Sequence, residues 1–572
     1  MTKKIIKRRT ENSIAIEKPL HPLLHRIYST RGISSMNELE RGLEHLLPFH
    51  DLMGINEAVR LLFDAIKHQQ KILIVGDFDA DGATSTAVAI RALKELGATS
   101  VDYLVPNRFA FGYGLTPELV QVAKENFAPD LIVTVDNGIA NHAGVVASKK
   151  LGIKVIVTDH HLPADTLPDA DAIVNPNQPG DSFASKHIAG VGVIFYVMLA
   201  LRRYLSEQNW FCQKNIPEPN MSRLLDLVAL GTVADVVSLD HNNRILVYQG
   251  LRRIRAGQCV PGMTALLEIS GKNQSRVMAS DLGFAVAPRL NAAGRLDDMS
   301  LGIECLLTSD LTRARELALV LTQLNDERRE IEQDMQIQAV DALKKIQTTM
   351  QVNGICLFDE EWHQGVVGIV AGRIKDRVHR PVIAFALSGT NELKGSARSI
   401  SGLHIRDVLA DIAVKYPNLI SKLGGHAMAA GLTLPRANYD TFARVFNEAV
   451  SEKLGKMDLQ HALLSDGELG QDELSLESAE VLREAGPFGQ SFPEPLFDGT
   501  FQILEQRLVG GRHLKLTLNH AEQMIQAIAF NVDINQWPDY HCDQINIAYR
   551  LDVNEYRGKR SVQLIVEHIE TA

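Results

Sequence analysis

Four short segments of the chain place acidic residues or histidines directly after an apolar run. They are Asp77-Phe78-Asp79-Ala80-Asp81, Asp136-Asn137-Gly138, Asp159-His160-His161 and Val233-Ala234-Asp235. Carboxylates and an imidazole that meet at one place can hold a pair of divalent cations, and such a pair activates water against a phosphate ester. The residue types therefore make phosphodiester hydrolysis the first hypothesis for this chain.

The runs in front of three of these segments predict parallel β-strands. Residues 71–75, 131–135 and 155–158 are short, β-branched and apolar on both faces, as expected of strands that helices cover on both sides. Helical stretches at 83–96 and 117–126 separate them, so the order is βαβαβ and the predicted fold is a doubly wound parallel sheet. Ligands of such sheets bind beyond the carboxyl ends of the strands, where the acidic segments fall.

Each segment taken alone has an ordinary structural explanation. An Asp after a strand is often only the N-cap of the next helix. Asp77, Asp79, Asp81 and Gly82 match the start of an EF-hand loop, but the twelfth position is Val88 instead of Glu and a strand precedes the loop, which excludes calcium binding by that motif. All four segments together favour one dinuclear site over four coincidences.

The four segments resemble the motifs of the DHH phosphoesterase superfamily. The form Asp-Phe-Asp-Ala-Asp-Gly resembles its RecJ branch, the single-strand-specific 5′ to 3′ exonucleases, and residues 288–295, 395–399, 424–431 and 486–495 extend the resemblance over nearly the whole chain. Two departures are visible. Val75 stands where many members carry His, and Ser491-Phe492 stands where relatives commonly have Gly-Asn.

The resemblance implies a division of labour within the metal site. Asp77 and Asp79 would hold one ion and Asp81, His160 and Asp235 the other, with Asp136 bridging the two. His161, which we expect to point away from its neighbour His160, would stabilise the transition state or protonate the leaving oxygen. Asp159 would orient an imidazole. Mn²⁺ and Mg²⁺ both suit oxygen ligands, and the imidazole favours Mn²⁺.

The resemblance also implies a set of substrate-binding residues. Arg108 and Tyr113 would narrow the entrance and stack a base, and Arg289 and Asn291 would contact the strand backbone. The remaining members belong to the DHHA1-like part, where glycines admit a close backbone approach and an arginine offers a bidentate fork to the terminal 5′ phosphate. They are Arg373, Ser396, Arg398, Gly425 and His426.

Length and sequence patterns, together with the resemblance, imply five regions in this α/β chain of 572 residues. They are an N-terminal arm (1–45), the DHH catalytic domain (46–265), a helical connector (266–350), the DHHA1 substrate-binding domain (351–450) and an OB-fold domain (455–572). The basic start Lys3–Arg9 is expected to be a flexible arm, because no apolar signal-peptide core follows it. Ser309–Met350 contains no Gly or Pro and predicts either a helical rod of about 60 Å or a broken helix pair.

Composition constrains the setting in which the protein works. No apolar run is long enough to span a bilayer, and five cysteines without a Cys-x-x-Cys pair suit a reducing cytoplasm. A net charge of −10 argues against a broad basic surface that wraps duplex DNA, but it is compatible with a narrow channel lined by a few arginines. We expect a cytoplasmic monomer that acts on single-stranded DNA, with a single-strand-binding protein and a helicase as candidate partners.

The resulting hypothesis is a two-metal exonuclease that degrades single-stranded DNA from 5′ to 3′ into 5′-mononucleotides in repair and recombination. Two alternatives stay open. One is a DHH phosphodiesterase for small substrates such as nano-RNA or cyclic dinucleotides, or a pyrophosphatase, which would not need the C-terminal barrel. The other is a non-catalytic RecJ-like scaffold, which would be expected to have lost metal ligands.

Overall fold

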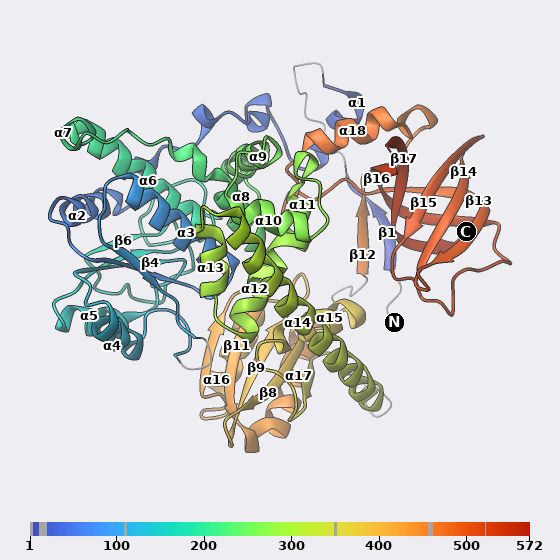
Figure 1. Cartoon of the computed structure of the whole chain (residues 1–572). Coiled ribbons are helices and arrows are strands. Elements are labelled where there is room, and N and C mark those ends of the chain that lie inside the picture. Colours follow the sequence, from blue (N-terminus) through green and yellow to red (C-terminus); the bar gives the residue numbers. More distant parts are fainter. Residues whose placement is uncertain are drawn as a thin grey trace. The chain divides into compact units, whose positions relative to one another are not determined.

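A computed structural model describes residues 4–10, 20–107, 111–347, 352–455, 461–520, 522–556 and 558–572. The chain divides into two compact units. One consists of Arg8–Asn325 with Ser465–Ala572, and the other of Met1–Lys7 with Asp326–Leu464. Figure 1 shows the elements along the chain.

The first unit is built on a five-stranded parallel sheet with the order β3-β2-β4-β5-β6. Its strands are β2 (Ile72–Gly76), β3 (Val101–Leu104), β4 (Leu131–Val135), β5 (Lys154–Thr158) and β6 (Ala172–Val174). Every residue of β2 and β4 is buried, which explains why these strands read as continuous apolar runs. The predicted doubly wound parallel sheet is confirmed.

Helices cover both faces of this sheet (Figure 1). The helices concerned are α2 (Ile55–Lys67), α3 (Ala80–Glu95), α4 (Pro117–Asn126), α5 (His142–Lys150) and α6 (Gly190–Glu207). Alternate strand residues face opposite ways, so Leu73 and Val75 share a core with α4 and α5, whereas Ile72 and Ile74 share one with α2, α3 and α6. Each fully buried Leu, Ile or Val contributes roughly 1.5–3 kcal/mol to folding.

A group of mostly short helices follows α6 in the chain. They are α7 (Trp210–Lys214), α8 (Leu225–Ala234), α9 (His241–Arg255), α10 (Pro261–Ile269), α11 (Ala279–Asp281), the π-helical turn η6 (Leu282–Val286), α12 (Ala287–Leu296) and α13 (Ser300–Leu307). Helix α8 packs on α3, α6 and α9. This packing holds the carboxyl end of α8, where Asp235 lies, in a fixed position relative to the sheet.

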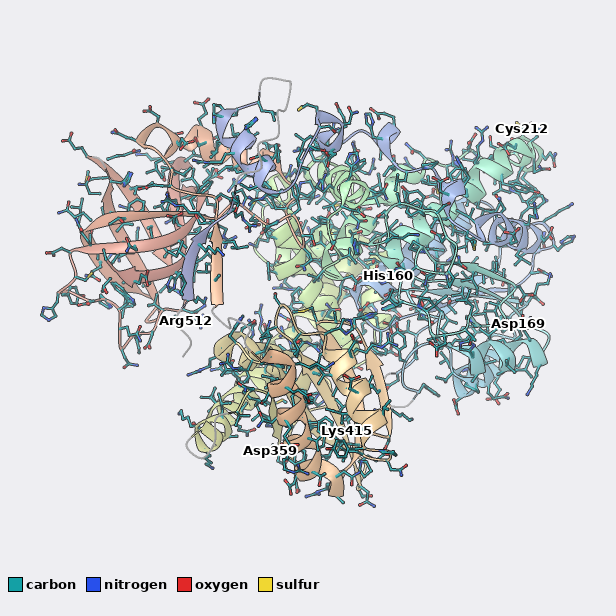
Figure 2. The ribbon with its side chains drawn as sticks, turned by 180° about the vertical axis from the view of Figure 1, so that it is seen from behind. His160, Asp169, Cys212, Asp359, Lys415 and Arg512 are labelled. Atoms are coloured by element: carbon teal, nitrogen blue, oxygen red, sulfur yellow. The ribbon has the colours of Figure 1, made fainter. Side chains whose placement is uncertain are left out.

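A closed five-stranded barrel completes the first unit, with the strand order β13-β14-β15-β17-β16. Its strands are β13 (Phe497–Val509), β14 (His513–His520), β15 (Gln523–Ala529), β16 (Gln544–Tyr556) and β17 (Lys559–Thr571), and helix α18 (Leu476–Ala485) precedes them. Leu514, Leu516 and Leu518 point into the barrel and are buried. The predicted barrel in the last hundred residues is confirmed, and Figure 2 marks Arg512 in the turn between β13 and β14.

The second unit contains a mixed five-stranded sheet with the order β10-β11-β9-β8-β7. Its strands are β7 (Ile355–Phe358), β8 (Val382–Ser388), β9 (Glu392–Arg398), β10 (Lys422–Gly425) and β11 (Ala429–Pro435), and its helices are α15 (Val367–Val378), α16 (Ile405–Lys415) and α17 (Tyr439–Leu454). Only β7 and β8 pair in parallel. This alternation of strands and helices agrees with the α/β character expected of this region.

Two connecting segments differ in how well the sequence predicted them. Helix α14 runs without a break from Leu311 to Gln347, so the helical rod is confirmed and the broken pair is not. The flexible arm is wrong for Lys4–Arg8, which forms strand β1 and pairs with β12 (His461–Ser465). A lone five-residue strand whose partner lies far along the chain leaves little local signal. Helix α1 (Pro22–Thr30) follows in the N-terminal region.

Among the helices that the structure describes, none is both long enough and apolar enough to cross a membrane.

Candidate active site

Adjacent strands of the parallel sheet deliver most of the candidate ligands to one edge. Asp77 follows β2 directly, Asp136 follows β4, and Asp159-His160-His161 follow β5. Because β2, β4 and β5 are neighbours, their carboxyl ends lie side by side. Figure 2 marks His160 in this region. The fourth segment comes from a helix instead of a strand, since Asp235 is the C-cap residue of α8.

The side chains converge into three overlapping groups. Asp77, Asp79 and Asp136 form one, Asp81, His160 and Asp235 the second, and Asp136 with His160 and His161 the third, and in each group the potential ligand atoms lie within 4.8 Å of one another. His160 Nε2 is 3.1 Å from Asp136 Oδ1, 3.5 Å from Asp235 Oδ2 and 3.9 Å from Asp81 Oδ2. Four segments that are distant in sequence thus meet at one site.

The backbone around Asp136 is shaped to bring this carboxylate to the centre. Asp136 has a φ of 62°, in the left-handed region that few residues other than glycine adopt. Gly190 at the start of α6 is equally constrained, because a Cβ atom there would lie 2.6 Å from the Cβ and Oδ1 atoms of Asp136. A glycine is therefore required where α6 approaches the site.

The first segment is held by the amino ends of two helices. Asp79 is the N-cap residue of α3, and its Oδ1 accepts hydrogen bonds of 3.0 Å from the amides of Asp81 and Gly82. Asp81 accepts from the amides of Gly190 (2.7 Å) and Val191 (2.9 Å) at the start of α6. The helix dipoles favour negative charge at both positions, so the carboxylates are fixed before any cation binds.

The crowding of buried carboxylates in this cluster favours the binding of a positively charged ion. Burial and the charge of Asp235 raise the pKa of Asp81 to about 7, and burial and the charge of Asp79 raise the pKa of Asp235 to about 7. Burial and the charge of Asp81 likewise raise the pKa of Asp136 well above its usual range. Crowded carboxylates of this kind are destabilised by desolvation and mutual repulsion, which a divalent cation relieves.

Two buried atoms at the centre of the cluster also indicate that it can hold divalent cations. Asp136 Oδ1 and His160 Nε2 have no hydrogen-bond partner among the described residues, although they face each other across 3.1 Å. Burial and the neighbouring His161 lower the pKa of His160, which favours the neutral imidazole that can donate a lone pair to a metal. Oxygen and imidazole donors at this spacing fit divalent cations such as Mn²⁺ and Mg²⁺.

Asp159 and His161 form a separate ion pair beside the cluster. His161 Nδ1 lies 2.7 Å from Asp159 Oδ1, and Asp159 also accepts from the amides of Ile139 and His160. Burial would lower the pKa of His161, but the charge and hydrogen bond of Asp159 raise it to about 10. Conversely, burial would raise the pKa of Asp159, but the charge and hydrogen bond of His161 lower it to about 2. In the metal-free protein, the ion pair with Asp159 therefore favours the protonated form of His161.

The expectation that His161 points away from His160 is wrong. The two ring centroids are 4.5 Å apart, and both rings reach Asp136. These residues lie beyond the end of β5, in a bend where the alternation of side chains along a strand no longer applies.

Tyr113 lies at the mouth of the site. Its hydroxyl donates to the carbonyl oxygen of Asp136 at 3.3 Å, and its ring contacts Phe78 and His161 edge to face with centroids 6.0 Å apart. The residue is 44% exposed, which leaves part of the ring accessible to a base. Arg108, the other predicted entrance residue, lies outside the described residues.

The side chains of Arg289 and Asn291 in α12 form hydrogen bonds within the protein. The amide of Ala80 donates to Asn291 Oδ1 at 2.8 Å, so Asn291 supports the first metal-binding segment. Arg289 is buried, and its Nε donates to Thr322 Oγ1 at 3.0 Å. The predicted contacts of these two residues with a strand backbone stay a prediction.

In the second unit, Ser396 and Arg398 lie together on one face of β9. Arg398 Nη1 donates to Ser396 Oγ at 3.0 Å. A Cβ atom on Gly368, at the start of α15, would lie 2.8 Å from Ser396 Oγ and 2.9 Å from Arg398 Nη2, so the helix amino end approaches both side chains. Burial lowers the pKa of Arg398, and no carboxylate lies within ion-pair distance of it among the described residues.

The other predicted residues of this unit take different positions. Gly425 ends β10 with a φ of 139°, and a Cβ there would lie 2.4 Å from the Cα atom of Ala430, so only glycine fits. The amide of His426 donates to the carbonyl oxygen of Ala429 in the turn that follows. Arg373, by contrast, forms an ion pair with Glu332 of α14 at 2.9 Å and is 59% exposed.

Two asparagines of the site were not among the residues predicted from the sequence. Asn177 Nδ2 donates to the carbonyl oxygen of His160 at 2.6 Å, and Asn175 Nδ2 donates to that of His161 at 2.9 Å. Both follow β6, the last strand of the sheet. The rule that located the metal-type residues, polar side chains just past an apolar strand, would also have found them.

Models of known protein families match three parts of the chain. The DHH family N-terminal domain matches residues 71–232, the DHHA1 domain residues 338–452 and the RecJ OB domain residues 465–568. The single-stranded-DNA-specific exonuclease RecJ of Salmonella typhimurium strain LT2 is 54% identical over 567 residues, which cover 98% of each chain.

Solved structures show the same similarity. A crystal structure of RecJ in complex with Mn²⁺ from Thermus thermophilus covers 96% of this chain and 76% of its own, with a TM-score of 0.77 and 31% identity. The corresponding complex with Mg²⁺ covers 96% of this chain and 75% of its own, with a TM-score of 0.73 and 29% identity.

Proposed function

Because this chain belongs to the RecJ family of single-stranded-DNA-specific exonucleases, we propose that it degrades single-stranded DNA from the 5′ end into 5′-mononucleotides. The proposal includes a role in DNA repair and recombination. Mn²⁺ or Mg²⁺ would serve as the cofactor, as the ions bound by the Thermus thermophilus relative suggest.

The observation that carries the proposal is the pair of ligand groups at the sheet edge. Asp77, Asp79 and Asp136 would hold one cation, and Asp81, His160 and Asp235 the other. Asp136 belongs to the first group and faces His160 of the second, which supports a bridging role. A scaffold without catalysis would not need to keep six such side chains in place, and the barrel is not required for a small substrate.

Bound divalent cations would supply charge stabilisation and an activated water at neutral pH. The protein's own groups have distinct tasks. Asp81 is pre-oriented by the amides of Gly190 and Val191. His161, whose pKa Asp159 raises in the metal-free protein, would place a positive charge and a proton beside the site, to stabilise the transition state or protonate the leaving 3′ oxygen.

Recognition of the 5′ end is assigned to Ser396 and Arg398. A half-buried guanidinium without a carboxylate partner among the described residues, next to the amino end of α15, is suited to bind a phosphate. Gly425 and His426 would complete this site. Tyr113, with Arg108, would stack or exclude bases at the entrance to the metal site. Arg289, Asn291 and Arg373 stay proposed contacts with the strand.

The partners proposed for this chain follow from the substrate. An enzyme that needs a single-stranded end depends on a helicase to supply it, and a single-strand-binding protein would cover the same strands. We also propose that the chain works as a monomer in the cytoplasm, where its cysteines, all free in the structure, would stay reduced.

Asp136→Ala tests the metal scheme. The variant is expected to stay folded and to lose more than nine-tenths of its hydrolysis of a labelled single strand, because no neighbouring group can replace the central carboxylate. Asp102→Ala changes an exposed carboxylate of β3 in the same domain and should keep normal activity. More than about a tenth of the wild-type rate in Asp136→Ala would rule out the two-cation scheme.

A further inference from the structure

The loop that follows Asp235, residues 236–240, begins in a backbone conformation that few side chains adopt. Val236 has a φ of 60°, and a β-branched residue in the left-handed region is a genuine outlier. Such a conformation persists only where the surrounding structure imposes it. Val236 is itself 63% exposed, so its own side chain contributes little packing. The contacts that hold this loop, and Asp235 in front of it, must therefore come from the residues that follow.

A tight turn from a distant part of the first unit contacts this loop. The turn Gly489–Phe492 closes on itself, because the amide of Phe492 donates to the carbonyl oxygen of Gly489 at 3.2 Å. The amide of Leu239 donates to the carbonyl oxygen of Gln490 at 2.8 Å. The Leu239 residue is only 3% exposed, and a Cβ atom on Gly489 would lie 2.8 Å from its Cδ1 atom. The turn thus holds the loop through both backbone and side chain.

Ser491 and Phe492, at which this turn departs from the family pattern, add two further contacts. Ser491 has a φ of 60° at the third turn position, where glycine or asparagine is favoured. Its hydroxyl oxygen lies 2.8 Å from that of Ser238, so a side chain at this unfavourable position gains a hydrogen bond to the loop. The guanidinium of Arg244 lies 4.4 Å from the centroid of the Phe492 ring, and Arg244 Nη1 donates to the carbonyl oxygen of Leu239 at 2.9 Å.

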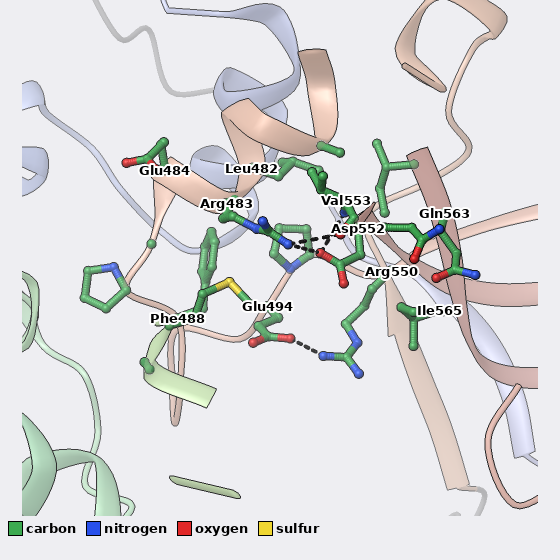
Figure 3. Close-up of a pocket in the computed structure, with 18 of the residues that line it drawn as sticks. Leu482, Arg483, Glu484, Phe488, Glu494, Arg550, Asp552, Val553, Gln563 and Ile565 are labelled. Atoms are coloured by element: carbon green, nitrogen blue, oxygen red, sulfur yellow. Dashed lines mark hydrogen bonds and ion pairs between the residues drawn. The ribbon is translucent and has the colours of Figure 1, made fainter. Parts of the chain in front are cut away.

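The chain segments on both sides of the turn are anchored to the barrel. Before the turn, Arg483 of α18 pairs with Asp552 of β16 at 2.8 Å, and after it, Glu494 pairs with Arg550 of β16 at 2.5 Å. Figure 3 shows both ion pairs, with Phe488 among the residues that line the same cavity of about 420 Å³. A turn that is anchored on both sides can hold the loop instead of moving with it.

We propose that the turn Gly489–Phe492 is a positioning element for the metal ligand Asp235. By holding residues 236–240 it keeps Val236 in its left-handed conformation and Asp235 Oδ2 at 3.5 Å from His160 Nε2. The inference rests on the proposed function, because it takes Asp235 as a ligand of the cation that His160 would also bind. It gives the barrel a part in cation binding at the DHH domain.

Substitutions at Gly489 should displace the loop without changing a ligand. Gly489→Ala places a carbon atom against Leu239, and Gly489→Val adds two methyl groups, so the effects should increase in that order. Gly470→Val is the matched control, because the atom nearest to a Cβ at this position is 3.8 Å away. Asp235→Ala is the reference for loss of the ligand itself. Binding of Mn²⁺ to each full-length protein is measured by calorimetry without DNA, which separates metal affinity from activity.

The wild type is expected to bind two Mn²⁺ ions, and Asp235→Ala to lose one of the two binding steps. Gly489→Val should weaken that same step at least about fivefold and the other by less than about twofold, because groups that orient one ligand affect the affinity of its own metal. Affinities within about twofold of the Gly470→Val control would overturn the positioning role. Equal weakening of both steps would also overturn it, since it would indicate a general loss of structure.

The ligand assignment has its own outcome in this experiment. Two unchanged binding steps in Asp235→Ala would contradict the assignment of Asp235 in the proposed function, and the positioning role with it. A lost step in Asp235→Ala together with unchanged binding in Gly489→Val would contradict the positioning role alone.

Hydrogen exchange of the wild-type protein keeps the test decisive if the Gly489 variants fail to fold. If the turn affects cation binding, cation binding must affect the turn by the same free energy. Saturating Mn²⁺ should therefore slow amide exchange in residues 236–240 and also in 488–492, and the second effect should be absent in Asp235→Ala. Residues 509–513, between β13 and β14 of the barrel, are the control segment. Exchange in 488–492 that does not change with Mn²⁺ would overturn the proposal.

Discussion

The role proposed for Arg398, which is binding of the 5′ phosphate, can be tested separately from the role of the cations. Arg398 is half-buried, donates to Ser396 at 3.0 Å and lies against the amino end of α15. Arg398→Ala should weaken binding of a 5′-phosphorylated strand by one to two orders of magnitude, because a charge-assisted bidentate contact is worth about 1.5–3 kcal/mol. It should also erase the preference for a 5′ phosphate over a 5′ hydroxyl.

Steady-state kinetics on matched oligonucleotides with the two 5′ ends would measure this effect. Turnover at saturating substrate should fall much less than in Asp136→Ala, because the metal site is untouched. Arg444→Ala, which removes an exposed arginine of α17 that pairs with Glu448, is the control. Wild-type discrimination in Arg398→Ala would show that Arg398 has only a structural role.

The raised pKa values of Asp81 and Asp235 predict how metal binding depends on pH. Both are about 7 in the metal-free protein, above the unfolded value of about 3.9, so the folded protein holds extra protons between these values. That contribution stabilises the metal-free form at low pH and is lost as pH rises through 7. A cation must displace these protons, which weakens its binding below pH 7 by up to about tenfold per proton and pH unit.

The rise in melting temperature that Mg²⁺ or Mn²⁺ produces should therefore be larger at pH 8 than at pH 6. Thermal unfolding at fixed ionic strength, with and without the cation, measures it. Asp136→Asn should show a much smaller rise at both pH values. A rise of equal size at the two pH values in the wild type would contradict the proton competition.

At the scale of elements, the packing of α6 against the end of β4 is the feature most sensitive to a small change. Gly190→Ala places a methyl group where only 2.6 Å separates it from Asp136, and the shift needed to relieve this overlap would also move the amides that hold Asp81. We expect a stability loss of about 1–3 kcal/mol and at least a tenfold loss of activity, with weaker Mn²⁺ binding by calorimetry.

Gly372→Ala provides the matched control, because a Cβ atom at this position in α15 meets no atom within 4 Å. It should leave activity and Mn²⁺ binding unchanged. Wild-type activity in Gly190→Ala would mean that α6 can move without disturbing the cluster.

The elements of the site differ in how far the sequence predicted them. Strands β2, β4 and β5 are buried on both faces, and their apolar runs therefore identified both the sheet and the edge at which Asp77, Asp136 and His160 meet. Gly190 and Val191 could not be found in this way. Each of them contributes a backbone amide, and the position of that amide depends on how the start of α6 packs. No local sequence pattern predicts this packing.

Other features could not be predicted from the sequence for related physical reasons. Strand β1 depends on a partner distant in sequence, and the close approach of His160 and His161 depends on a bend after β5. The ligand roles and the domain boundaries stay predictions. The geometry makes the ligand roles testable one residue at a time.

At the scale of the whole molecule, we expect burial of the metal site to determine which nucleic acids can react. The His160 side chain is only 11% exposed and that of Asp136 only 2%, while the ring of Tyr113 lies at the mouth with its hydroxyl 3.3 Å from the Asp136 carbonyl oxygen. A phosphodiester must therefore pass an aromatic ring to reach buried carboxylates. An extended single strand can do so by turning its bases aside, whereas a duplex end is wider and keeps its bases paired and stacked.

Blunt duplex DNA should consequently be spared, and a 5′ overhang should be trimmed back to the junction with the duplex. Denaturing gels of labelled single-stranded, blunt and 5′-overhang substrates would show this directly. Tyr113→Ala should reduce the contrast, because it widens the mouth without removing a candidate ligand, while Tyr540→Ala removes an exposed ring on the barrel unit and serves as the control. Equal rates on duplex and single-stranded DNA in the wild type would mean that selection for single strands does not arise at this entrance.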